Sequence, residues 1–275
     1  MHQLVLKDWE FQKFRRYVRD VSGINLHEGK KALLKARLGK IIRQRNFRSF
    51  GEYYDHVVSD KSGLELITLL NSISTTLTHF FREPQHFYFL TKKALPEILK
   101  TKGPSENISF WCAGCSSGEE AYSIAIAVGE ALDNMENGQI NILATDLSTK
   151  VLTTAATGIY DKKKLNTMTY DLKRKYFQKG ENRWKGYFKA KKAIREKITF
   201  QRLNLMEEFQ LRESFDVIFC RNVMIYFDEP AKEVLLEKLY QHLANKGYLF
   251  IGHSESLTGK KWPLKYIQPT IYRKI

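Results

Sequence analysis

The sequence is poor in cysteine and contains no long apolar run. Its 275 residues include three cysteines, Cys112, Cys115 and Cys220, an odd number that is far too small for a disulfide framework, so we expect reduced thiols. No apolar stretch reaches the roughly 20 residues of a membrane-spanning helix. The first residues, MHQLVLKDWEFQKF, also lack the apolar core of a secretory signal. We therefore expect a cytoplasmic protein without membrane insertion.

Acidic residues are scarce relative to basic ones. The 30 Asp and Glu residues face 45 Lys and Arg residues, which gives a formal net charge of +15. This imbalance indicates a polyanionic partner, but the sign of the charge does not separate nucleic acid, anionic lipid and an acidic protein face. With 43% hydrophobic and 13% aromatic residues, the chain is expected to fold throughout.

The first part of the chain has helical periodicity. Apolar residues recur at helical spacing over residues 11–21, and Gly23 is suited to end that helix. Ser49 followed by Glu52 fits a capping box, and Ser62 is placed to begin a further helix. The pattern predicts four helices before any strand.

One of these helices, KKALLKARLGKIIRQR, is strongly basic. Its predicted apolar stripe consists of Leu34, Leu38, Ile41 and Ile42, and Arg37, Lys40 and Arg43 are expected to point away from it. The basic residues of this segment are Lys30, Lys31, Lys35, Arg37, Lys40, Arg43, Arg45 and Arg48. The sequence alone leaves open whether they form a solvated face or a docking surface.

Strands alternate with helices in the rest of the chain. The strand-like segments are ISFWC, INILATD, ITFQRLN, FDVIFCRN and GYLFIGH. Helical segments separate most of them, a rhythm typical of a doubly wound, mainly parallel sheet. Residues 161–197 interrupt the rhythm with short pieces rich in Lys and aromatic residues, which predicts a small inserted β unit.

A glycine loop and an acidic residue lie at the expected ligand-binding edge of this sheet. Gly114 and Gly118 in WCAGCSSGEEAYSIA let the backbone approach a ligand, but a plain strand-to-helix turn is the alternative. The loop lacks GxGxxG and GK[ST], which disfavours a dinucleotide or a triphosphate. Asp146 ends the second strand and could accept two ribose hydroxyls or cap a helix. Together they favour an adenosine ligand.

Further polar residues are expected at the same edge. The strand FDVIFCRN delivers Arg221 and Asn222 there, although an arginine could equally form a structural salt bridge. The CxxC pair has no second pair or histidine cluster to accompany it, so we predict no metal. We expect His253 to be a structural histidine at a strand end.

Several segments, taken together, identify a family. FFREP, WCAGCSSGEEAYSIA, ATDLS, GIY, FDVIFCRNVMIYFD and GYLFIGHSE occur in this order, and between about residues 8 and 272 the chain resembles the chemotaxis receptor glutamate O-methyltransferases. The run CRNVMIYFD is the most specific of them. The resemblance implies an all-α N-terminal domain at residues 1–73 and a linker at residues 74–90. It further implies a Rossmann-like, doubly wound α/β methyltransferase domain at residues 91–275, with a small antiparallel β insertion at about 161–197.

The resemblance also implies a cofactor and a set of site residues. S-adenosyl-L-methionine, and its product S-adenosyl-L-homocysteine, would be surrounded by Thr76, Thr78, Arg82, Gly114, Glu119, Asp146, Asn204, Leu205, Arg221 and Asn222. Tyr226 would lie near the point of methyl transfer, and Arg221, Tyr226 and Arg82 would be the catalytic residues. Thr76 stands where the family commonly has Asn, and a threonine keeps one hydroxyl but lacks the two donors of the amide.

The implied substrate requires no general base. A glutamate side chain, with a reference pKa near 4.3, is already a carboxylate at neutral pH. Orienting it in line with the departing sulfur is then the main task, for which Arg221 and Tyr226 are the candidates. The basic helix would dock the glutamate-rich cytoplasmic helices of the receptor, and the insertion would hold a receptor C-terminal peptide. The resemblance implies a monomer recruited to receptor arrays at the membrane.

Two other functions are compatible with parts of the sequence. A nucleic-acid methyltransferase would suit the positive charge, but the chain lacks the aromatic NPPY-type segment of enzymes that methylate base amines. CRNVMIY occupies that place, and an arginine that directs a carboxylate suits a neutral base poorly. An inactive cofactor-binding module is supported only by Thr76.

Overall fold

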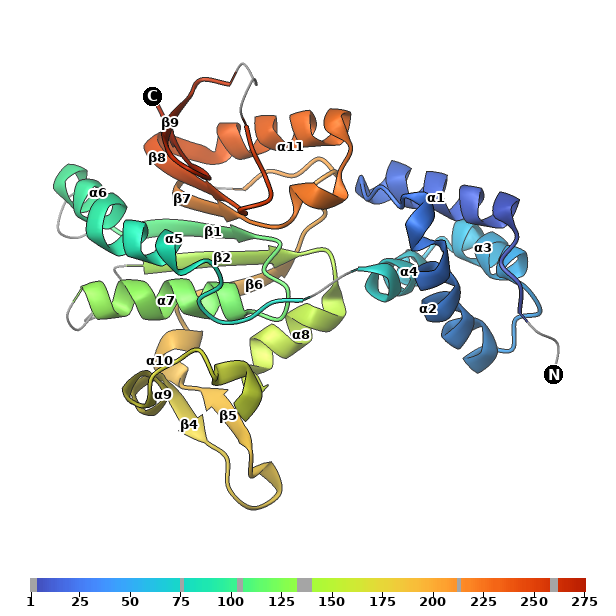
Figure 1. Cartoon of the computed structure of the whole chain (residues 1–275), viewed down its shortest axis with the longest axis horizontal. Coiled ribbons are helices and arrows are strands. Elements are labelled where there is room, and N and C mark those ends of the chain that lie inside the picture. Colours follow the sequence, from blue (N-terminus) through green and yellow to red (C-terminus); the bar gives the residue numbers. More distant parts are fainter. Residues whose placement is uncertain (1–3, 75–76, 103–105, 133–139, 212–213, 258–261) are drawn as a thin grey trace.

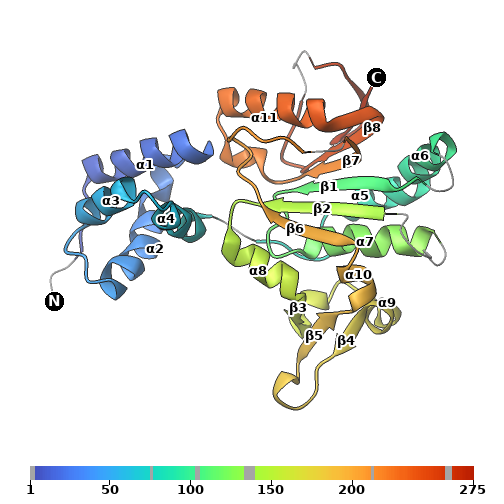
Figure 2. The same cartoon turned by 180° about the vertical axis from the view of Figure 1, so that it is seen from behind.

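The computed structural model describes residues 4–74, 77–102, 106–132, 140–211, 214–257 and 262–275. A small helical domain lies beside a larger α/β domain, and a third, smaller unit projects from the α/β domain (Figures 1 and 2). Within the described residues, no helix is sufficiently long and apolar to traverse a bilayer.

The helical domain has a core of its own. It contains α1 (Asp8–Ser22), α2 (Lys31–Gln44), α3 (Phe50–Ser59) and α4 (Leu64–Ile73). Phe11, Phe14, Leu38 and Tyr53 are fully buried at its centre, which confirms the helical periodicity of this region. Gly23 ends α1 in the left-handed conformation, as predicted.

Two predicted helix starts differ in detail. Ser49 accepts the backbone N–H of Glu52 at 3.1 Å, but the Glu52 carboxylate accepts the N–H of Arg48 rather than that of Ser49, so only half of the capping box forms. Helix α4 begins at Leu64, two residues after the predicted Ser62, and its N-cap is Gly63 in the left-handed conformation.

Arg37, which was expected to point away from the apolar stripe of its helix, bonds to the end of α4. Its guanidinium donates to the backbone carbonyls of Ser72, Ile73 and Ser74 at 3.2, 2.8 and 2.9 Å. The last carbonyls of a helix have no partner within that helix, and Arg37 satisfies those at the end of α4. Arg37 is therefore part of the architecture of the helical domain.

A seven-stranded sheet forms the centre of the α/β domain. Its strands are β1 (Ile108–Ala113), β2 (Ile140–Asp146), β6 (Ile198–Arg202), β7 (Phe215–Cys220), β8 (Leu243–Ile251), β9 (Leu264–Gln268) and β10 (Ile271–Lys274). The order is β6-β2-β1-β7-β8-β10-β9, and the first five strands in this order pair in parallel. Strand β10 runs antiparallel to both its neighbours, a closing hairpin that the sequence pattern did not predict.

Helices cover both faces of the sheet. One face packs on α5 (Pro84–Phe89), α6 (Leu95–Thr101) and α7 (Glu119–Ala131), and the other on α11 (Glu229–His242) (Figure 1). Strand residues alternate between the two cores, with Phe110 in the first and Trp111 in the second. A π-helical turn at Leu90–Ala94 joins α5 to α6 just before Pro96, whose ring cannot continue a regular helix.

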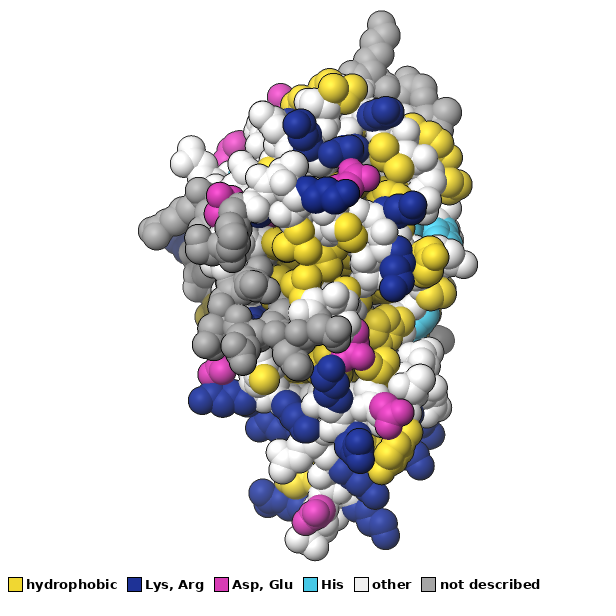
Figure 3. All heavy atoms as spheres, turned by 90° about the vertical axis from the view of Figure 1, so that its left-hand side faces the viewer, with side chains coloured by type: hydrophobic (Ala, Val, Ile, Leu, Met, Phe, Trp, Pro, Cys, Tyr) yellow, Lys and Arg dark blue, Asp and Glu magenta, His cyan; other side chains and the backbone are white. Residues whose placement is uncertain are grey.

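The predicted insertion is a three-stranded antiparallel sheet. Its order is β3 (Ile159–Asp161), β5 (Tyr187–Ala190) and β4 (Phe177–Lys179), and it follows α8 (Thr149–Thr157). The short helices α9 (Tyr170–Tyr176) and α10 (Lys192–Arg195) complete the unit. Figure 3 shows Lys and Arg side chains gathered over this projecting part, at the bottom of that view.

Candidate active site

A cavity of about 280 Å³ opens at the carboxyl ends of the parallel strands. The chain runs from β1 through β2 to β6 on one side and then returns to β7 on the other side of β1, so the connections diverge between β1 and β7. Ligands of doubly wound sheets bind at such a point. Gly114 follows β1 with φ 84°, and a Cβ there would come within 2.4 Å of Val223 Cγ2. Only glycine fits at this position without displacing the opposite wall.

The carboxylate of Asp146 lies in the cavity wall at the end of β2. Its two oxygens accept the backbone N–H groups of Ser116 and Ser148 at 2.8 and 2.9 Å. Burial raises the pKa of Asp146, and these hydrogen bonds oppose the rise. An ionised carboxylate has about four acceptor positions, more than these backbone N–H groups occupy, so capacity remains for ligand hydroxyls. This arrangement suits a ribose.

The helical domain forms the other side of the cavity, where residues from the end of α1 to Lys30 contribute to the lining. Several bonds join the two domains at this edge. The N–H of Asn25 donates to the carbonyl of Tyr226 at 2.8 Å, and the amide of Asn204 donates to the carbonyl of Val21 at 2.6 Å. Arg19 pairs with Asp228 at 2.6 Å. The cavity is therefore shared by both domains.

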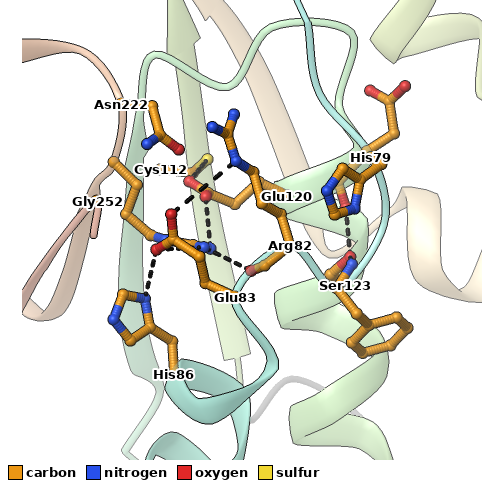
Figure 4. A network of polar contacts seen from close by, with 12 residues as sticks. His79, Arg82, Glu83, His86, Cys112, Glu120, Ser123, Asn222 and Gly252 are labelled. Carbon is orange, nitrogen blue, oxygen red and sulfur yellow. Dashed lines mark hydrogen bonds and ion pairs between the residues drawn. The ribbon is translucent and has the colours of Figure 1, made fainter. Parts of the chain in front are cut away.

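Arg221 is the centre of a buried ion network with Glu83 and Glu120. Figure 4 shows these two carboxylates in close-up. The Arg221 side chain is fully buried, with Nη1 at 2.9 Å from Glu120 Oε2 and Nη2 at 3.0 Å from Glu83 Oε2. Burial raises the pKa of Glu120, and the charge of Arg221 limits the rise. Burial also acts to raise the pKa of Glu83, but Arg221 outweighs it, and the pKa of Glu83 lies below its usual value. Arg221 thus holds two carboxylates in place.

The three predicted catalytic residues differ in how free their polar groups are. Arg221 lines the cavity, but its guanidinium is already paired with Glu83 and Glu120. The side chain of Arg82 is 35% exposed, with Nη1 at 3.3 Å from the carbonyl of Leu77. Tyr226 is half-buried in the cavity wall, and its hydroxyl makes no hydrogen bond within the described parts of the chain.

Glu119 and its neighbour Glu120 face different parts of the structure. Glu119 is fully buried and does not line the cavity, because its carboxylate pairs with Lys164 at 2.7 Å and accepts the hydroxyl of Ser117 at 2.6 Å. Glu120 lines the cavity instead. Successive helical residues point about 100° apart, so one of the two acids had to turn away. The sequence carries no signal for which one does.

Most of the other predicted cofactor contacts meet at the cavity, and Thr76 lies outside the described residues. Thr78, Asn204, Leu205 and Asn222 all line it. Asn222 has φ 59°, a left-handed conformation in which a Cβ on Gly252 would come within 2.5 Å of its side chain. Gly252, the second glycine of GYLFIGH, is thus required because Asn222 approaches it so closely.

The CxxC cysteines belong to the core. Both are buried and free, and burial raises the thiol pKa of Cys112 and of Cys115. Cys112 Sγ lies 3.2 Å from a carboxylate oxygen of Glu120. Their thiols are therefore poor nucleophiles, since the thiolate is the reactive form.

Fold and site together define an S-adenosylmethionine-dependent methyltransferase: a glycine loop, a ribose-type acid and a cavity at the point where the strand order reverses. Residues 9–74 match the family described as CheR methyltransferase, all-alpha domain, and residues 76–273 match CheR methyltransferase, SAM binding domain. The chain belongs to the CheR methyltransferase family.

Curated relatives cover nearly the whole chain. A chemotaxis protein methyltransferase of Borreliella burgdorferi is 41% identical over 274 residues, covering 98% of this chain and 95% of the relative. A probable chemotaxis protein methyltransferase of Rhizobium etli is 36% identical, covering 92% and 94% of the two chains. Chemotaxis protein methyltransferase 2 of Pseudomonas aeruginosa is 34% identical, covering 96% and 92%. These similarities confirm the resemblance found in the sequence.

Proposed function

We propose that the protein transfers the methyl group of S-adenosyl-L-methionine to glutamate side-chain carboxylates of chemotaxis receptors, forming methyl esters and S-adenosyl-L-homocysteine. The observation that carries the proposal is the shared cavity, with Asp146 at the end of β2 and, in the same wall, the hydroxyl of Tyr226, which has no hydrogen-bond partner among the described residues. The names of the curated relatives support the receptor as substrate.

The residues present fit the cofactor. Asp146 has acceptor positions for the ribose hydroxyls, and Glu120 offers a carboxylate to the cationic amino group. Leu203 and Leu205 supply apolar surface for the adenine ring. When bound, the cofactor supplies an electrophilic methyl group on a sulfonium. The protein then has to hold a carboxylate that is already ionised, so no base is needed.

Orientation of the incoming carboxylate falls to Tyr226 and Arg82 in this proposal. Tyr226 has a free hydroxyl, and the guanidinium of Arg82 is partly exposed at the cavity. Arg221, which the sequence also favoured for this role, is committed to its two carboxylates, and we assign it the positioning of Glu83 and Glu120. A correctly held reactant can lower the barrier by roughly 7–11 kcal/mol.

Docking of the receptor helices is proposed to use the free part of the basic helix. Four of its basic residues are exposed and make no ion pair within the described regions: Lys35, Lys40, Arg43 and Arg48. Lys31 pairs with Asp8 and Arg45 with Glu65. Arg37 donates to backbone carbonyls at the end of α4, and Lys30 lines the cavity. Opposite charge on a glutamate-rich helix would raise encounter rates and fix its orientation.

The insertion is proposed as a second point of attachment. Its strands β3 and β4 are the edges of a three-stranded sheet, and an edge strand can accept an extended peptide by backbone hydrogen bonding. A receptor C-terminal peptide held there would bring a monomeric enzyme to the membrane receptor arrays. The basic surface of this unit suits an acidic peptide (Figure 3).

A methyl-transfer assay tests the function. Protein and tritiated S-adenosylmethionine are incubated with receptor-containing membranes, with RNA and with DNA. We expect label in the receptor that mild base releases as methanol, because an ester is base-labile. Label in nucleic acid but not in the receptor would refute the proposal, as would base-stable label.

A further inference from the structure

Three side chains with metal-binding atoms converge directly behind the cofactor cavity. Glu83 precedes α5, His86 lies within α5, and His253 follows β8. Glu83 Oε2 is 3.5 Å from His86 Nδ1 and 3.7 Å from His253 Nε2. One donor atom from each residue fits within 4.8 Å of the other two. Figure 4 shows Glu83 and His86 facing each other.

The hydrogen bonds of His86 identify which ring nitrogen carries its proton. His86 Nε2 lies 2.6 Å from Thr270 Oγ1, and the hydroxyl of Thr270 donates its only hydrogen to the carbonyl of Pro269 at 2.6 Å. Because this hydroxyl is engaged with Pro269, its oxygen is left to accept, which favours the tautomer of His86 with the proton on Nε2. In a neutral imidazole the other nitrogen then has a free lone pair. His86 Nδ1 is that nitrogen, and it points at Glu83.

His86 Nδ1 is a buried acceptor without a partner. The residue is 1% exposed, and Nδ1 makes no hydrogen bond within the described structure. Its neighbours are a carboxylate oxygen and a second imidazole, so three acceptors surround one point. Converging acceptors of this kind are stabilised by a cation.

We propose that Glu83, His86 and His253 form a three-ligand site for a borderline divalent transition-metal ion such as Zn²⁺. Two imidazoles and one carboxylate are also the protein ligands of Zn²⁺ in several catalytic sites. In a tetrahedral site with bonds of about 2.0–2.1 Å, donor atoms lie roughly 3.3 Å apart. Glu83 Oε2 is 3.5 Å from His86 Nδ1 and 3.7 Å from His253 Nε2, which is close to that spacing. The side chain of His253 is 51% exposed, which leaves a path for the ion and a fourth position for water.

The chemistry of the site argues against Mg²⁺ and Ca²⁺. These hard ions prefer six or more oxygen ligands, whereas two of the three donors here are nitrogens. Arg221 bonds to the same oxygen of Glu83 and would repel a weakly held ion. An ion with strong affinity for imidazole is therefore required. Because Glu83 is shared with Arg221, a bound ion would also stiffen the network behind the cavity.

Cobalt substitution provides a direct test. Co²⁺ added to the metal-free protein should give visible d–d absorption that saturates at one equivalent and is displaced by Zn²⁺. His253→Ala removes a half-exposed ligand and should weaken binding at least 100-fold, because even residues behind a ligand contribute about 10- to 100-fold. His27→Ala, a change of an exposed histidine in the helical domain, is the matched control and should bind as the wild type does.

Each outcome supports or overturns the site. Absence of saturable absorption, or equal binding by His253→Ala and the wild type, would refute it. Intense near-ultraviolet bands from sulfur ligands would assign the ion to cysteines instead. S-adenosylhomocysteine binding, measured by calorimetry, shows that each variant is folded. Since the readout is metal binding alone, its failure would leave the proposed methyl transfer standing, and the reverse also holds.

Discussion

Replacing Arg221 by methionine is expected to lower the free energy of unfolding of the α/β domain by about 3–5 kcal/mol near neutral pH. Methionine keeps much of the length of the side chain but removes the charge. The buried carboxylates of Glu83 and Glu120 then lose the partner that lies at 3.0 and 2.9 Å. An unpaired buried charge is the dominant cost, rather than the loss of the attraction itself.

This cost should depend on pH in a definite direction. Without Arg221, the folded-state pKa values of Glu83 and Glu120 both rise, so the folded variant binds protons that the unfolded chain releases. A group with a raised folded pKa loses its stabilising contribution as pH increases. The deficit relative to the wild type should therefore be largest at pH 7–8. It should shrink as the pH falls through these raised pKa values, because protonated Glu83 and Glu120 no longer bury an unpaired charge in the variant.

Urea unfolding at several pH values, followed by fluorescence and circular dichroism, measures the effect. Arg43→Met makes the same chemical change at an exposed position and should alter stability by less than about 0.5 kcal/mol. Adding Glu120→Gln to Arg221→Met should recover part of the loss. A deficit below about 1 kcal/mol, or one that does not vary with pH, would show that the ion network is not what stabilises this region.

Three further predictions concern the cavity and the docking surface. Asp146→Asn should weaken S-adenosylhomocysteine binding roughly 10- to 100-fold by calorimetry, because hydrogen bonds to a charged acceptor are lost; unchanged affinity would contradict the ribose assignment. Tyr226→Phe should lower kcat about 10- to 100-fold while leaving cofactor affinity intact, and full turnover would remove Tyr226 from the mechanism. Lys40→Glu with Arg43→Glu should raise the KM for receptor several-fold at low salt, with kcat preserved, and an equal effect at high salt would argue against electrostatic docking.

The parts of the fold with a clear local period could be predicted from the sequence. The alternation of strands and helices predicted the doubly wound sheet, and the short pieces rich in Lys and aromatic residues predicted the insertion. The hairpin of β9 and β10 was missed, because its strands are only five and four residues long and β9 lacks a clear apolar alternation. Short edge elements depend on their neighbours for stability more than on their own residues.

The sequence predicted which residues lie at the site but not where their side chains point or what they contact. Gly114, Asp146 and Arg221 could be placed at the sheet edge from strand ends alone, and all three line the cavity. That Arg221 is enclosed by acids could not be foreseen, because Glu83 and Glu120 lie about 140 and 100 residues away along the chain. The convergence of His86 and His253 has the same origin. Contacts between distant segments leave no periodic signal in a single sequence.

The hydrogen bond from Asn25 to the carbonyl of Tyr226 ties the helical domain to the wall of the cofactor cavity. The segment from Ser22 to Leu26 continues directly from α1 and borders the cavity, so the bundle that bears α2 also carries one wall of the cofactor chamber. A receptor bound to α2 would therefore contact the domain that carries this wall. Receptor docking at α2, as proposed above, would therefore act on the same domain that forms this wall, which would couple acceptor binding to the shape of the cofactor cavity.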